Sequence, residues 1–251
     1  MRSFQGKRNW LVGASEGLGL SLARMLTADG VTVVISGRNA VRLAKVRAEL
    51  PGALVQAVDA ASNVSVRAAA EVVGPVDGPV FLAGVYWPMK ADAIDAEKLV
   101  ALCDVNFTGC ARLLGAVLPG MVARGGGHVV LTGSLSGYRG SPGSMGYSAS
   151  KSGVMALAEC LEADLRGSGI KVQLGNPGFI KTRLTEKNHF AMPFLMTADE
   201  AAAHMLRLMK GERISLAFPW AFAAMFRLSQ FLPDWAYYRL LGPKRAPLRA
   251  E

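Results

Sequence analysis

The chain has 251 residues, of which 51% are hydrophobic and 19% charged, and its formal net charge is +9. This length supports one large α/β domain or two small ones, and the apolar content can form a core without disulfides or structural metal. The three cysteines and three histidines show no disulfide or metal-ligand spacing, so we expect no metal site. The dispersed positive charge favours small anionic ligands over nucleic acid. No uninterrupted run of about 20 apolar residues predicts a membrane-spanning helix, and we expect a cytoplasmic protein.

Short apolar runs alternate with helical patterns along the chain. The runs are rich in Val and Leu and continuously apolar, as in strands that are buried on both faces. The alternation predicts an α/β, doubly wound, Rossmann-like fold with a seven-stranded parallel sheet and helices on both faces. We expect one domain over 1–251, with a core at 1–218 and an aromatic-rich, basic C-terminal extension at 219–251. The expected strands are 9–13, 32–36, 54–58, 80–83, 128–132, 171–175 and 214–218, and the expected helices are 18–28, 40–50, 64–73, 96–123, 148–165 and 198–209.

The first expected strand runs into a glycine-rich loop, Gly13-Ala14-Ser15-Glu16-Gly17-Leu18-Gly19, and then into a helix. Glycines let the backbone turn sharply and approach a pyrophosphate, and the helix N-terminus offers free N–H groups to that anion. The spacing Gly-x-x-x-Gly-x-Gly differs from the commoner dinucleotide fingerprint. Its position directly after the first strand nevertheless predicts a dinucleotide cofactor.

The second expected strand is followed by Arg38. An NAD site usually places a carboxylate here to accept hydrogen bonds from the ribose 2′-OH, whereas the 2′-phosphate of NADP needs a cation. No Asp or Glu occurs between Gly30 and Ala48. The sequence therefore predicts NADP(H) as the preferred cofactor, with NAD(H) as the alternative.

A Tyr-x-x-x-Lys pattern, Tyr147 to Lys151, begins thirteen residues after Ser134. The spacing i and i+4 places the phenol and the ammonium on one face of a helix. A free tyrosine has a pKa near ~10, and we expect the neighbouring ammonium to lower this pKa. Ser134 follows the fifth expected strand, where its hydroxyl can hydrogen-bond a substrate carbonyl. The pattern predicts acid–base chemistry on a carbonyl or alcohol.

With the glycine loop and these three residues, the chain resembles the short-chain dehydrogenase/reductase family over about residues 5 to 218. The resemblance implies that Ser134 steadies the carbonyl oxygen, Tyr147 donates the proton and Lys151 contacts the ribose. It also implies that Asn106 holds a water for a proton relay through Lys151. The catalytic residues it implies are Asn106, Ser134, Tyr147 and Lys151. The cofactor-binding residues it implies are Gly13, Ser15, Glu16, Gly17, Leu18, Gly19, Arg38, Asp59, Ala60, Ala83, Gly84, Tyr147, Lys151, Pro177, Gly178, Ile180 and Thr182.

Two segments depart from the family pattern. The Asn-Asn-Ala-Gly segment of the family reads Phe81-Leu82-Ala83-Gly84 here. Members that use NADP often carry Lys or Arg in the glycine loop, where this chain has Ser15-Glu16. The resemblance also implies a homodimer or homotetramer, formed through the helices expected at 96–123 and 148–165.

Segments 135–146 and 179–197 are expected to line the substrate pocket. The second is rich in apolar side chains: Phe179, Leu184, Phe190, Met192, Phe194, Leu195 and Met196. A mobile apolar lid suits a lipid-like or aromatic carbonyl compound, although ordinary loop packing explains the same residues.

The C-terminal extension carries aromatic residues beside Arg227, Arg239, Lys244 and Arg245. This composition fits a helix at a membrane interface, and equally a helix packed on the lid or on a partner subunit. It is loosely similar to the ketosphinganine reductase branch of the family. Pro219 and Pro233 should break any single continuous helix.

The leading hypothesis is an NADP(H)-dependent oxidoreductase that reduces an apolar ketone, such as a 3-oxoacyl, ketosphingoid or steroid-like compound. One alternative is an NAD(P)-dependent alcohol dehydrogenase that works in the oxidative direction. Another is a non-catalytic, nucleotide-sensing protein of the same fold. The complete set of Asn106, Ser134, Tyr147 and Lys151 favours an enzyme.

Overall fold

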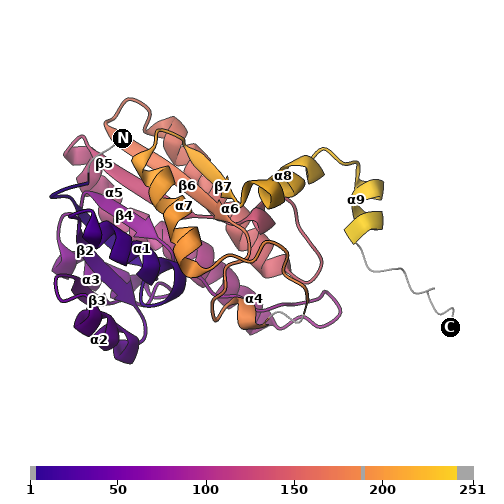
Figure 1. Cartoon of the computed structure of the whole chain (residues 1–251), viewed down its shortest axis with the longest axis horizontal. Coiled ribbons are helices and arrows are strands. Elements are labelled where there is room, and N and C mark those ends of the chain that lie inside the picture. Colours follow the sequence, from indigo (N-terminus) through magenta and orange to yellow (C-terminus); the bar gives the residue numbers. More distant parts are fainter. Residues whose placement is uncertain (1–3, 188–189, 242–251) are drawn as a thin grey trace.

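The computed structural model describes residues 4–187 and 190–241 (Figure 1). Seven strands form one parallel sheet in the order β3-β2-β1-β4-β5-β6-β7. The strand order reverses between β1 and β4, and in open α/β sheets ligands bind at such a switch point, outside the carboxyl ends of the strands. All seven expected strands are confirmed: β1 (Arg8–Val12), β2 (Thr32–Gly37), β3 (Leu54–Ala57), β4 (Gly78–Phe81), β5 (Gly127–Thr132), β6 (Ile170–Pro177) and β7 (Ser215–Phe218).

Helices cover both faces of the sheet, so the fold is the expected doubly wound, Rossmann-like one. Side chains of α1, α2 and α7 pack on one face, and side chains of α3, α5 and α6 pack on the other. The bounds are α1 (Gly17–Ala28), α2 (Ala40–Glu49), α3 (Asn63–Val73), α4 (Ala96–Cys103), α5 (Gly109–Ala123), α6 (Met145–Asp164), α7 (Ala198–Lys210), α8 (Trp220–Ser229) and α9 (Asp234–Leu241).

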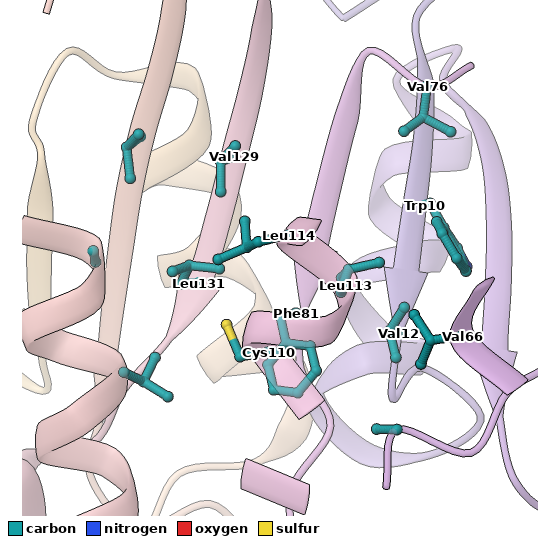
Figure 2. Close-up of a cluster of buried hydrophobic side chains, with 14 of the residues drawn as sticks. Trp10, Val12, Val66, Val76, Phe81, Cys110, Leu113, Leu114, Val129 and Leu131 are labelled. Carbon is teal, nitrogen blue, oxygen red and sulfur yellow. The ribbon is translucent and has the colours of Figure 1, made fainter. Parts of the chain in front are cut away.

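The central strands are buried on both faces, which explains their continuously apolar sequences. On one face, Leu113 and Leu114 of α5 lie against the sheet beside Phe81 of β4 and Leu131 of β5 (Figure 2). Trp10 of β1 is fully buried there, and its indole N–H donates a hydrogen bond of 2.9 Å to Ser36 Oγ. This core fixes the ends of β1, β4 and β5, from which the candidate site is built.

The helix expected at 96–123 is present over its whole predicted length, but it is not one continuous α-helix. A π-helical turn, Asp104–Thr108, separates α4 from α5. Wider turns of this kind often occur at functional sites, and this one contains Asn106. By length and composition alone the run Ala96–Ala123 could cross a membrane. Its buried side chains instead form part of the core, so it is a core helix.

The two prolines of the C-terminal extension precede two separate helices, as expected. α8 begins directly after Pro219 and α9 directly after Pro233. Both helices extend beyond β7, away from the sheet (Figure 1). Lys244 and Arg245 lie outside the described residues.

Candidate active site

The glycine-rich loop brings the end of β1 against the segment that follows β4. Gly13 has φ +93°, and a Cβ there would lie 2.3 Å from the backbone nitrogen of Ala83. A Cβ on Gly19 would lie 2.5 Å from the Cα of Ala14. These two close approaches require glycine. They leave the N-terminus of α1 facing the carboxyl ends of β1 and β4, where an anion can be bound.

A cavity of about 640 Å³ opens at this point and runs along the carboxyl ends of the strands. The sequence-predicted cofactor residues come together in its wall, although they are distributed from the first strand to the segment after the sixth. The lining residues predicted from sequence are Gly13, Ser15, Glu16, Gly17, Leu18, Gly19, Arg38, Asp59, Ala60, Ala83, Gly84, Tyr147, Lys151, Pro177, Gly178, Ile180 and Thr182. We call this space the cofactor cavity.

The end of the cofactor cavity beyond β2 carries two arginines. Arg38 is exposed and forms no ion pair among the described residues, whereas Arg42 lies one helical turn further on, in α2. Arg42 Nη1 lies 3.2 Å from Glu16 Oε1, and Arg183 Nη2 lies 2.8 Å from the same oxygen. The acidic residue of the loop is therefore balanced by two cations. Arg42 and Arg183 were missed in the sequence analysis. The i, i+4 spacing between Arg38 and Arg42 could have indicated Arg42, whereas no spacing indicates Arg183.

The other end of the cofactor cavity contains Tyr147 and Lys151, both on α6. The Lys151 ammonium is buried and donates a hydrogen bond of 2.9 Å to the Thr132 carbonyl. Its Nζ lies 5.9 Å from the centre of the Tyr147 ring. The buried Ser134, after β5, shares a side-chain hydrogen bond with Tyr147. The structure brings Ser134, Tyr147 and Lys151 together at one place.

The expected direction of the Tyr147 pKa shift is wrong in this structure. Burial raises the pKa of Tyr147 to about 12; the hydrogen bond with Ser134 opposes this shift, and the neighbouring Tyr86 phenol adds to it. Burial also lowers the pKa of Lys151 to about 8. Removal from water is the largest cause of both pKa shifts, and the ammonium is directed at the Thr132 carbonyl. The phenol is consequently held protonated at neutral pH.

Tyr86 is a residue that the sequence analysis did not single out. Its ring meets the Tyr147 ring edge to face, with 5.1 Å between the ring centres. Burial raises the pKa of the Tyr86 phenol. The backbone carbonyl of Tyr86 accepts a hydrogen bond of 2.8 Å from Lys187 Nζ, which ties the loop after β4 to the segment after β6.

Asn106 lines neither cavity. Its fully buried amide accepts a hydrogen bond of 2.8 Å from the Val85 N–H. The same amide donates to the Val85 carbonyl at 3.1 Å and to Ser150 Oγ at 3.0 Å. The Asn106 side chain is therefore engaged in joining the loop after β4 to α6. The expected role of Asn106 in a proton relay stays a prediction.

A second cavity, of about 720 Å³, meets the cofactor cavity at Tyr147. We call it the substrate cavity. Ser134 and Tyr86 lie in its wall beside Tyr147, and most of the remaining wall is apolar. Of the predicted lid residues, Phe179, Leu184 and Phe190 line this space, whereas Met192, Phe194, Leu195 and Met196 do not.

Helix α8 closes the substrate cavity with Phe222 and Phe226. The Phe222 ring lies 5.5 Å from the ring of Phe179 and 5.6 Å from that of Phe194, measured between centres. Among the alternatives for the C-terminal extension, packing on the lid is therefore observed for α8. Leu241, at the end of α9, also borders the cavity.

The donor set fits a dinucleotide. Glycine backbone at a helix N-terminus suits the pyrophosphate, and the arginines at one end suit a phosphate. Gly84 lies next to Lys151 in the wall, since a Cβ there would lie 3.9 Å from Nζ. Within residues 4–187 and 190–241, no group of three His, Cys, Asp or Glu could hold a metal ion.

The short chain dehydrogenase family model matches residues 8–191 of the chain. An uncharacterized oxidoreductase of Myxococcus xanthus (strain DK1622) is 38% identical over 233 residues, which cover 89% of this chain and 92% of that protein. Dehydrogenase/reductase SDR family member 7B of Danio rerio is 32% identical over 73% of this chain and 64% of that protein. The chain belongs to the short-chain dehydrogenase/reductase family and is an oxidoreductase of that family.

Solved structures of the family are also similar. A short chain dehydrogenase/reductase family protein, 29% identical, has a TM-score of 0.80 and covers 86% of this chain and 97% of its own. A gluconate 5-dehydrogenase from Burkholderia cenocepacia J2315, solved in complex with NADP and tartrate, is 26% identical. Its TM-score is 0.79, with 88% of this chain and 96% of that chain covered.

Proposed function

We propose that the protein is an NADP(H)-dependent reductase of an apolar ketone. The observation that carries this proposal is the position of Tyr147 at the junction of the cofactor cavity and the substrate cavity. A carbonyl group in the substrate cavity can reach Tyr147 and Ser134 while it faces the cofactor cavity. Oxidoreduction with a nicotinamide cofactor follows from the family, whereas the substrate class and the cofactor preference are proposals.

The proposed chemistry assigns one task to each side chain. Bound NADPH supplies the hydride. Ser134 hydrogen-bonds the carbonyl oxygen, and Tyr147 gives its phenolic proton to that oxygen. The Lys151 ammonium stabilises the phenolate that remains on Tyr147, and Asn106 positions the site by fixing the loop after β4.

The protonation state of Tyr147 favours the reductive direction. A phenol with a pKa of about 12 is a proton donor at neutral pH, which is the role that reduction requires. The alternative alcohol dehydrogenase would need the phenolate at the start of the reaction. The nucleotide-sensing alternative does not explain why Ser134, Tyr147 and Lys151 are assembled beside an apolar cavity.

The preference for NADP rests on the two arginines beyond β2. Arg38 is free among the described residues, and Arg42 borders the same end of the cofactor cavity. Guanidinium groups form strong, charge-assisted hydrogen bonds with phosphate oxygens. The 2′-phosphate of NADP is the cofactor group that such a pair would bind.

The proposal of an apolar substrate rests on the wall of the substrate cavity. Leu135, Phe179, Phe190, Phe222 and Phe226 contribute to this wall. A volume of about 720 Å³ accommodates a lipid-like, 3-oxoacyl, ketosphingoid or steroid-like ketone.

The test is turnover by the purified full-length protein. NADPH absorbance is followed with a panel of ketones that ranges from small and water-soluble to long-chain and steroidal, with NADH in parallel. We expect the highest kcat/KM for apolar ketones with NADPH. Saturable binding of NADPH without reduction of any ketone would instead support the nucleotide-sensing alternative and overturn the proposal.

We also propose a single-domain, cytoplasmic protein that forms a homodimer or homotetramer through α4, α5 and α6. Val100 of α4 and Phe107 of the π-helical turn after it are exposed in the single chain, so apolar area is available for a partner copy. Sedimentation of the purified protein tests this state.

A further inference from the structure

Helices α8 and α9 and the turn between them, residues 219–241, carry an unusual amount of exposed apolar surface. We call this segment the C-terminal arm. Phe231 is 84% exposed, Trp220 81% and Trp235 72%. Aromatic side chains of this size present roughly 150–250 Å² each, so the arm exposes a few hundred Å² of apolar area, an amount that in one contiguous patch marks an interaction site.

Helix α8 is apolar on both of its faces. Phe222 and Phe226 point inward to the substrate cavity, whereas Trp220, Met225 and Leu228 are exposed on the opposite side. Apolar surface on two faces of a helix is normally covered, by protein or by lipid. The protein covers one face of α8, and the outer face needs a partner.

Helix α9 adds an amphipathic surface of the kind found at membrane–water interfaces. Tyr237 is buried and faces the body, and the helical period places Trp235 and Arg239 on the opposite side. Tyr238, which is 63% exposed, lies on the flank between them. Trp and Tyr beside Arg are typical of segments that lie among lipid headgroups. Arg227 of α8 is a second cation of the arm, with its guanidinium against the Tyr138 ring of the body. The chain as a whole has a net charge of +9.

The arm is fastened to its own body. The Arg139 guanidinium stacks 3.8 Å from the centre of the Tyr237 ring and donates a hydrogen bond of 2.8 Å to the Leu232 carbonyl. The same group pairs with Asp234 at 2.7 Å, and Tyr237 Oη donates to the Gly140 carbonyl at 2.7 Å. These contacts hold the inner side of the arm on the body of the protein, so the outer side is the surface that is left for a partner.

We propose that the outer face of the arm docks on an anionic lipid surface and brings the substrate cavity to the membrane. The inner face of the same helices supplies Phe222, Phe226 and Leu241 to the wall of that cavity. An apolar ketone dissolved in the bilayer thus has a short path past the arm to Tyr147. Docking is inferred only from the exposed surface of the arm, whereas the delivery of substrate rests on the proposed reductase function.

The experiment measures co-sedimentation of the full-length protein with two kinds of vesicles, one of phosphatidylcholine and one of equal parts phosphatidylcholine and phosphatidylglycerol. The arm variant carries Trp220→Ser, Phe231→Ser and Trp235→Ser. The matched control carries Val41→Ser, Val64→Ser and Val72→Ser, at positions of α2 and α3 that are 68%, 79% and 72% exposed. NADPH binding and thermal unfolding establish that both variants are folded.

We expect the wild type and the control to bind the anionic vesicles, more weakly as salt rises, and the arm variant to lose about tenfold or more of its partition coefficient. Three results would overturn docking: no binding by the wild type, equal loss in the control, or an arm variant that changes only the oligomeric state. The last result would assign the exposed face to a second copy of the chain.

Turnover separates this inference from the proposed function. Reduction of cyclohexanone in solution should be equal in the wild type and the arm variant, and only reduction of a long-chain ketone supplied in anionic vesicles should fall. Vesicle binding without turnover of any ketone leaves the docking intact and rejects the reductase. Turnover in solution without vesicle binding by the wild type rejects the docking alone.

Discussion

Glu16 and Arg183, which are 167 positions apart in the chain, form an ion pair of 2.8 Å across the cofactor cavity. The pair joins the glycine-rich loop to the segment after β6. Arg42 contacts the same carboxylate oxygen, so one acid holds two cations beside the end of the cavity that the 2′-phosphate would occupy.

Glu16→Gln should strengthen the binding of NADPH. The change removes a negative charge near the proposed phosphate position and releases Arg42 and Arg183. Because exposed ion pairs contribute up to about 1 kcal/mol, we expect the Kd for NADPH to fall by about three- to fivefold. The Kd for NADH should change less, and fluorescence titration of both cofactors checks this. Weaker NADPH binding would show that the acid is needed to position the arginines.

Arg38→Ala and Arg42→Ala should each reduce the preference for NADPH. A hydrogen bond to a charged group contributes about 1.5–3 kcal/mol, so the ratio of Kd values for NADPH and NADH should rise by about 10- to 100-fold. Arg47→Ala is the control, since Arg47 lies in the last turn of α2 and does not border the cofactor cavity. An unchanged ratio in both variants would reject the proposed phosphate site.

The sheet and the residues at its carboxyl edge were predictable because they depend on local patterns. Continuously apolar runs identified the buried strands, and Gly13, Ser134 and Tyr147 follow or flank strand ends that a parallel sheet brings to one edge. The pairings of Glu16 with Arg183 and of Tyr86 with Tyr147 depend on loops that return from elsewhere in the chain. No spacing in the sequence indicates such contacts.

The direction of the Tyr147 pKa shift shows a second limit of the sequence. The i, i+4 spacing correctly placed Lys151 near Tyr147, but a pKa depends on burial as well as on neighbours. The direction of the Lys151 ammonium, toward the Thr132 carbonyl, is set by the packing of α6 on β5. The π-helical turn at Asp104–Thr108 likewise follows from tertiary contacts of Asn106 and not from helix propensity.

Tyr147→Phe should abolish most of the reductase activity while NADPH still binds, since the ring stays in the wall of the cofactor cavity. The change removes only the hydroxyl, and loss of a general acid typically costs about 10²- to 10⁴-fold in rate. Single-turnover oxidation of bound NADPH measures the chemical step, and fluorescence titration measures the Kd. A rate within about threefold of the wild type would show that another group supplies the proton.

Reduction should slow as pH rises through about 8. Burial lowers the pKa of Lys151 to about 8, so its ammonium is charged below this pH and neutral above it. The pKa of Tyr147, about 12, keeps the proton donor intact over the same range. The pH profile of kcat/KM should therefore lose activity on its alkaline side. In Lys151→Arg the guanidinium keeps its charge to high pH. The pH profile of this variant should therefore lack the alkaline loss of activity, although its overall rate is lower. The same alkaline loss of activity in the wild type and in Lys151→Arg would show that a group other than Lys151 titrates near pH 8.

Arg139→Ala should loosen the C-terminal arm and weaken the binding of apolar ketones. The guanidinium donates hydrogen bonds to the carbonyls of Ser229 and Leu232 and pairs with Asp234. Their loss should cost the arm about 2 kcal/mol or more of local stability. Amide hydrogen exchange in residues 220–241 should then speed up by about 30-fold or more, with no change in the strands.

The kinetic effect of Arg139→Ala should depend on the size of the ketone. Because Phe222 and Phe226 hold one wall of the substrate cavity, the KM for a long-chain ketone should rise while the KM for cyclohexanone stays constant. Arg166→Ala is the control, since the Arg166 side chain is 74% exposed and lies 3.9 Å from its partner Glu162. Equal KM changes for both ketones would mean that the substitution disturbs Ser134 or Tyr147 and does not act through the arm.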